Sequence, residues 1–133
     1  MPYRDSTPAQ PLIVALGKSV FALEVKTGRR LWTWTEARTS SSAKVFVEGD
    51  RVYVLKLDVV SCLALATGEV LWQGEAPSAD TLLVRSGFVF VGGAGVVKAF
   101  LPDGSTLWEE PFLGSGTDSV ALVIEENATF EVD

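Results

Sequence analysis

Short apolar segments alternate with polar turns along the whole chain. The apolar runs are four to seven residues long and rich in β-branched and aromatic residues, with Gly, Asp and Ser between them. No stretch combines a sustained helical period with capping residues. This pattern predicts an all-β chain of short strands joined by tight turns.

A six-residue motif recurs three times within this pattern. The three copies are Thr27–Trp32, Thr67–Trp72 and Asp103–Trp108. Each copy has glycine second and ends in Leu-Trp, and the tryptophans are 40 and then 36 residues apart. A short apolar segment precedes each motif, and a hairpin-like pair of segments precedes that one in the second and third copies. Four strands per unit of about 40 residues are typical of a β-propeller blade.

The residue types in the motif suit a turn followed by a packing strand. Glycine tolerates the positive φ that a tight turn requires, and Thr or Asp can hydrogen-bond to nearby backbone. The tryptophan is expected to lie on the outer strand and to bury its ring against the neighbouring blade. The predicted blade-docking residues are Trp32, Trp72, Trp108, Gly28, Gly68 and Gly104. Trp34 lies outside the repeat and is expected to add packing.

The segment Ala22–Trp32 resembles the tryptophan-docking repeat of the PQQ-like, or quinoprotein-like, β-propellers. The pattern of that family reads roughly Ala-Leu-Asp-x-x-Thr-Gly-x-x-x-Trp. Glu24 stands at its acidic position, Ala64 replaces it in the second copy, and the third copy is one residue shorter. The resemblance covers residues 11–126. It implies the propeller fold but no particular function, because one fold hosts many functions.

The boundaries of the repeats do not coincide with the two ends of the sequence. The first copy lacks its first strand, because residues 11–17 align with the second strand of a blade. Residues after the third copy align with a first strand. The chain therefore contains enough strands for three blades, each a four-stranded antiparallel sheet. Its expected organisation is an N-terminal tail (1–10) and a three-blade propeller half (11–133), with repeats at 11–41, 42–79 and 80–118 and a closing strand at 119–126.

Three blades do not close a ring, since propellers have about four to eight. Open ends would expose apolar faces and unpaired strand edges. We therefore expect a second copy to complete a six-bladed ring, as a homodimer with a blade shared between the chains. The residues expected to pair between subunits are Leu12, Val14, Leu16, Val120, Leu122 and Ile124. The alternative is that the chain is a piece of a longer propeller. The initial Met1 and the whole number of three blades argue against this alternative.

Charge is unevenly distributed along a chain whose net charge is −6. Residues 1–56 hold nine Lys/Arg and five Asp/Glu, whereas residues 57–133 hold two and twelve. Ends of opposite sign fit a head-to-tail contact, and a chance gradient over a solvated surface is the alternative. An acidic chain without an apolar run of about 18 residues is not expected to bind nucleic acid or a membrane. The polar N-terminus is unlike a secretory signal and the single Cys62 permits a reducing compartment, so a cytoplasmic protein is expected, and its source is expected to be bacterial.

No catalytic, metal-binding or cofactor-binding residues are predicted. The chain has no histidine, which removes the commonest general base and metal ligand. PQQ and Ca²⁺, which the resemblance implies for dehydrogenases, need a carboxylate and amide cluster, and Asn127 is the sole asparagine. The glycines of 92–95 are interpreted as a turn between strands rather than a phosphate cradle, and Cys62 as a buried apolar residue.

These observations predict a non-catalytic scaffold or protein-interaction module, with no cofactor. Besides a second copy, an unidentified protein partner is a further candidate. The alternative is a cofactor-binding or enzymatic subunit whose site forms at the centre of the assembled propeller. That alternative needs polar groups on the innermost strands. These strands, expected at 43–47, 81–84 and 120–124, are mostly apolar, with Lys44 as their only charge.

Overall fold

The computed structural model describes residues 11–36 and 43–125, which form strands and no helix. The strands are β1 (Leu12–Leu16), β2 (Ser19–Leu23), β3 (Arg30–Thr35), β4 (Lys44–Glu48), β5 (Arg51–Lys56), β6 (Val59–Ala64), β7 (Val70–Glu75), β8 (Thr81–Arg85), β9 (Phe88–Gly93), β10 (Val96–Phe100) and β11 (Thr106–Glu110). The prediction of an all-β chain is confirmed. Within the same ranges, no helix is long and apolar enough to cross a membrane.

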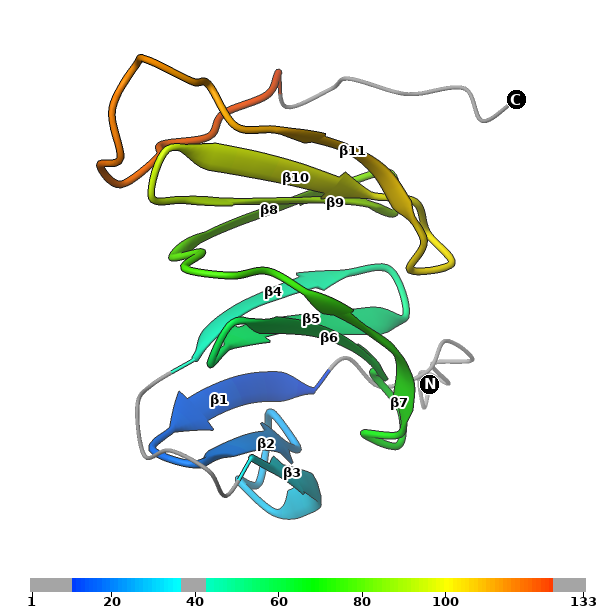
Figure 1. Cartoon of the computed structure of the whole chain (residues 1–133). Helices are drawn as coiled ribbons and strands as arrows, with labels where there is room; N and C mark the ends of the chain where they lie inside the picture. The colour runs from blue at the N-terminus through cyan, green and yellow to red at the C-terminus, as the bar shows by residue number, and fades with distance from the viewer. Residues whose placement is uncertain (1–10, 37–42, 126–133) are drawn as a thin grey trace.

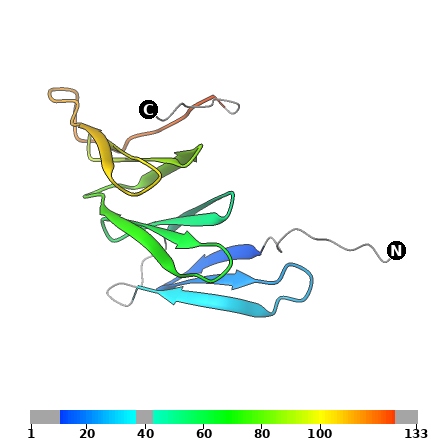
Figure 2. The same cartoon turned by 90° about the vertical axis from the view of Figure 1, so that its right-hand side faces the viewer.

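The strands form three separate antiparallel sheets that follow the order of the repeats. The first sheet is β1-β2-β3, the second β4-β5-β6-β7 and the third β8-β9-β10-β11. Within each sheet, strands that are consecutive in sequence pair with one another, so every sheet is a simple meander. Figures 1 and 2 show the sheets stacked face to face as successive blades. As the alignment of the repeats predicts, the described part of the first sheet has three strands and lacks the inner strand that the other two possess.

The outer strand of each sheet follows the same local geometry. The motif glycines Gly28, Gly68 and Gly104 have φ values of 75°, 78° and 92°, a region that side chains with a Cβ rarely adopt. Directly after each turn, the pairing with the preceding strand shifts register, as in a β-bulge. Bulges increase the local twist and redirect side chains. Trp32 and Trp72, which follow the first two bulges, contact the next sheet.

The hydrophobic core lies between the sheets rather than inside one of them. Val52, Val54 and Leu63 of the second sheet are fully buried against the first. On its opposite face, Tyr53 and Val60 are buried against the third sheet. Since β5 and β6 are covered on both faces, they read as continuous apolar runs instead of alternating ones.

Polar contacts reinforce both junctions. Lys56 Nζ donates to the carbonyl oxygen of Gly17 across the first junction, at 2.7 Å. Across the second, the Glu48 carboxylate accepts from the backbone N–H groups of Ser86 and Gly87 at 2.9 and 2.7 Å. Each blade is thereby fixed to the next by side chains near the strand ends.

Residues 119–125, predicted as part of a closing strand that pairs with another chain, form no strand within this single chain. They lie across the third sheet, where Thr81 Oγ1 donates to Val120 O at 2.6 Å and Ser119 Oγ donates to Asp80 Oδ2 at 2.8 Å. A strand needs a hydrogen-bonding neighbour, and no described strand lies along this segment. Residue 126 and the predicted tail at 1–10 lie outside the described residues.

Candidate interaction site

Two of the three motif tryptophans dock on the turn of the next blade. Trp32 packs over Gly68 so closely that an added Cβ there would lie 2.6 Å from the ring. Its Nε1 donates to Leu65 O at 2.8 Å. Trp72 repeats this arrangement on Gly104, also at 2.6 Å, and donates to Pro102 O at 3.0 Å. Each dock therefore combines a ring stacked on a glycine with one hydrogen bond to a turn carbonyl.

Trp108, the third motif tryptophan, is followed by no further blade among the described residues and stays 43% exposed. Its ring lies 6.3 Å from that of Phe90, on the outer face of the third sheet. Nothing in residues 11–36 and 43–125 accepts a hydrogen bond from its Nε1. A hollow of about 160 Å³ adjoins the ring, and its lining is apolar: Leu83, Phe90, Val97, Trp108, Leu122, Val123 and Ile124.

The terminal segment has the alternating burial of a strand although it forms none. Val120, Leu122 and Ile124 are half-buried toward the third sheet, whereas Ala121 and Val123 are exposed, Val123 by 94%. Val120 lies against Gly92 of β9. The segment therefore occupies the place of an inner strand for a further blade, with one face already packed.

The outer face of the first sheet is open in the same way. Leu12 pairs with Leu23 as Val52 pairs with Leu63, so these positions are equivalent in the two sheets. Val52 and Leu63 are 0% exposed, whereas Leu12 is 54% exposed. Phe21 lies on the same open face, with the Arg30 guanidinium 4.8 Å above its ring. The face of the second sheet that the first sheet buries is therefore exposed at the equivalent positions of the first sheet.

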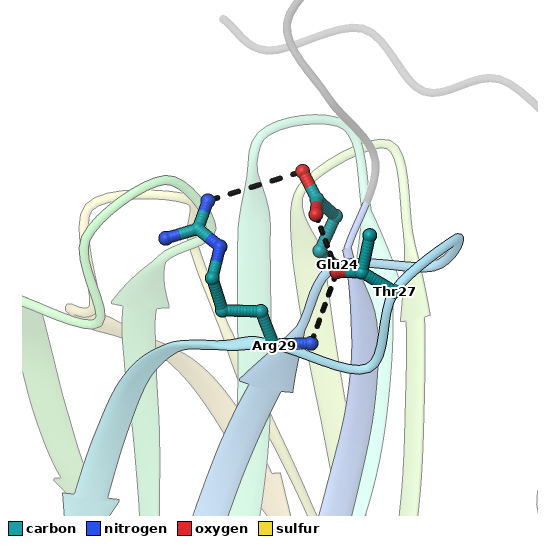
Figure 3. Close-up of polar contacts among 3 residues, drawn as sticks. All are labelled: Glu24, Thr27 and Arg29. Carbon is teal, nitrogen blue, oxygen red and sulfur yellow. Dashed lines mark hydrogen bonds and ion pairs between the residues drawn. The ribbon is translucent and has the colours of Figure 1, made fainter.

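The turn of the first sheet has the shape of the docked turns but holds no tryptophan. Gly28 N donates to Glu24 O and Glu24 N to Arg29 O, both at 2.8 Å, and the Gly68 turn makes the same two bonds at the same lengths. In Figure 3, Thr27 bridges Glu24 and the Arg29 backbone, while the Arg29 guanidinium approaches Glu24 at 3.9 Å. An added Cβ on Gly28 would meet nothing within 4 Å.

The inner strands offer little for a cofactor. A hollow of about 420 Å³ between β4 and β8 is lined by Ala43, Lys44, Val45, Asp80, Thr81 and Leu82. Asp80 is its one carboxylate, and Ser119 Oγ donates to that group at 2.8 Å. No three of His, Cys, Asp and Glu gather among the described residues in a way that could hold a metal ion. This donor set does not fit Ca²⁺, which takes six to eight oxygen ligands.

Cys62 packs inside the second junction. It is fully buried, and burial raises the pKa of its thiol, while Arg51 Nη1 lies 3.9 Å from Sγ. Arg51 directs its main hydrogen bond elsewhere, to Pro102 O at 2.7 Å. Because the thiolate is the nucleophilic form, this setting suits a packing role.

The sequence profile of the family described as outer membrane protein assembly factor BamB matches residues 16–129. The chain belongs to this family. The match and the structures below confirm the resemblance to PQQ-like propeller repeats. No curated protein matches the sequence.

Solved structures show the same fold at low identity. BamB from Moraxella catarrhalis is 22% identical with a TM-score of 0.62, over 77% of this chain and 34% of its own. Quinohemoprotein alcohol dehydrogenase from Comamonas testosteroni is 21% identical with a TM-score of 0.65, over 77% and 19%. The computationally designed Ika8 protein is 17% identical with a TM-score of 0.72, over 92% and 39%. This chain thus spans about a third of the BamB chain, and the blades are those of a β-propeller.

The predicted pairing residues lie at the two opposite ends of the stack, so one chain does not bring them together. Leu12, Val14 and Leu16 are on β1, and the other three are on the terminal segment. Sequence reasoning missed Val25, which is 68% exposed although its equivalent Leu65 is 4% exposed. The alignment of the repeats carries the signal, since Val25 stands two residues before Thr27 as Leu65 stands two before Thr67.

Proposed function

We propose that this protein is a non-catalytic β-propeller scaffold for protein interaction, which assembles by sharing a blade between two copies. One observation carries the proposal. Among residues 11–36 and 43–125, the first sheet has no inner strand, and residues 119–125 form an inner-strand segment that belongs to no sheet. Two copies arranged head to tail supply both missing parts twice, and three sheets from each copy make a six-bladed ring.

The second sheet supplies the register for the shared blade. There Val45 pairs with Val54 and Val47 with Val52. Applying these pairs to the ends of the chain sets Leu122 opposite Val14 and Ile124 opposite Leu12 of the other copy. All four side chains then lie on one face of the sheet, the face that packs on the third blade.

Distribution of charge supports the same head-to-tail arrangement. The exposed turn of the first sheet carries Lys26 and Arg29, and β3 begins with Arg30, while β11 carries Glu109 and Glu110. Opposite charges on two surfaces steer their association and disfavour contact between like ends. The donor set at the inner strands supports a role without catalysis. The expected cytoplasmic location stays a prediction.

The mass in solution tests this proposal. Light scattering on a sizing column should give about twice the 14.3 kDa of one chain. A variant ending at residue 118 should be monomeric, because it lacks the shared strand. A variant ending at residue 125 is the matched control and should remain dimeric. A full chain that stays monomeric at every concentration contradicts the shared blade.

A further inference from the structure

We infer that the joint between copies is closed by a tryptophan dock, in which Trp108 of one copy packs on Gly28 of the other and donates from Nε1 to Val25 O. The inference rests on the proposed shared blade and specifies its contacts. A second copy of this chain binds the exposed end of the stack. Two such docks would close the ring.

The side chain that docks is Trp108, which lies on the exposed strand β11. Trp108 occupies in β11 the position of Trp72 in β7, since Trp108 pairs with Ala99 as Trp72 pairs with Cys62. Trp72 is docked on the following blade and stacks at 5.7 Å from Phe100, whereas Trp108 is 43% exposed. The difference between the two is the presence of a following blade.

The acceptor is a turn that is already folded. Gly28 and Gly68 have φ values of 75° and 78°, and the hydrogen bonds that close their turns match in length. Val25 stands where Leu65 stands, and Leu65 O accepts from Trp32 Nε1 at 2.8 Å. A preformed turn loses little conformational freedom when the ring arrives, which favours association.

The joint also has room for the side chain two residues after the docking tryptophan. Trp72 is followed two residues later by Gly74, where an added Cβ would lie 2.5 Å from the Phe100 ring. The corresponding donor residue after Trp108 is Glu110. Its counterpart in the other copy is Leu23, a smaller residue than Phe100. The first junction accepts a still larger side chain at this position, because Trp34 packs against the cluster that contains Leu63.

Charge fits at this same place. Arg30 pairs with Leu23 across β2 and β3 and lies exposed over Phe21. In the assembled joint, Glu110 therefore faces the Leu23–Arg30 pair of the other copy. At the two internal junctions the position of Arg30 is held by Val70 and Thr106, which are uncharged. The ionic pair is thus specific to the joint between copies.

The dimer dissociation constant of the full chain, measured by sedimentation, tests the dock through Gly28→Ala. The strain of a Cβ at positive φ is present in monomer and dimer alike, so the dissociation constant reports only the contact with the ring. Overpacking of this kind weakens each joint about tenfold, and therefore the two joints about 100-fold. Gly49→Ala is the matched control, with a φ of 61° and nothing within 4 Å of the added Cβ. It should leave the constant within about twofold.

A charge exchange tests the facing residues independently. Arg30→Glu and Glu110→Arg should each weaken the dimer about tenfold, and the double variant should restore it. Circular dichroism checks that every variant is folded. A dimer that neither Gly28→Ala nor the single reversals weaken overturns the dock and leaves the shared blade standing. A wild-type monomer at all concentrations overturns both.

Discussion

The dock inside the chain can be tested by Gly68→Ala. The new methyl group would lie 2.6 Å from Trp32 Cε3 and 2.7 Å from Cδ2, well inside van der Waals contact. The ring cannot simply rotate away, because its Nε1 is held by Leu65 O and the cluster of the first junction packs around it. The substitution should therefore destabilise the fold through this one contact.

The expected loss in free energy of unfolding has two parts. A Cβ at a φ of 78° costs about 1–2 kcal/mol wherever it occurs. Overpacking against Trp32 adds about 1–3 kcal/mol. Gly49→Ala carries the first part alone, since its φ is 61° and its added Cβ meets nothing within 4 Å. Both changes also reduce the freedom of the unfolded chain by a similar amount, which cancels in the comparison.

Urea unfolding followed by tryptophan fluorescence measures the comparison, at one fixed protein concentration because association adds to stability. Gly68→Ala should be less stable than Gly49→Ala by about 1–3 kcal/mol. In a Trp32→Leu background the two alanine variants should differ by less than about 0.5 kcal/mol. Equal stabilities in the background that retains the tryptophan would refute the reasoning that the ring rests on this glycine.

Two further residues give testable expectations. Glu48→Ala removes the carboxylate that two backbone N–H groups of the next hairpin share, and should cost about 1–2 kcal/mol in urea unfolding. Glu69→Ala, at an exposed turn position, should cost less than about 0.5 kcal/mol, and equal effects would count against the contact. Cys62 should resist thiol reagents at pH 8 until the protein unfolds, and rapid labelling of the native state would contradict its burial. Because its folded pKa is raised, stability should fall above about pH 8.5, and Cys62→Ala should reduce that fall.

The sequence by itself determined the repeating unit. The period of the Gly and Leu-Trp motif predicts blades, and the alternation of apolar runs with turn residues predicts their strands; both follow from local chemistry. The absence of the first strand in the first copy is also visible in the alignment of residues 11–17 with the second copy. A turn glycine and a β-branched run act within a few residues, so such features need no knowledge of distant contacts.

Only the tertiary structure decided which copies of the motif are satisfied. Trp32, Trp72 and Trp108 are alike in sequence, yet two are docked and one is exposed. Gly28 and Gly68 have the same backbone geometry, and only Gly68 carries a ring. The difference depends on whether another blade follows, which no local pattern records.

The terminal segment gives the same lesson for strand formation. Its apolar alternation predicts a strand, and its side chains pack on the third sheet as those of an inner strand would. A β-strand nevertheless exists only through hydrogen bonds to a neighbour, and a helix alone satisfies its backbone within one segment. The composition of residues 119–125 therefore fixes their propensity, whereas the presence of a partner strand decides whether that propensity is realised.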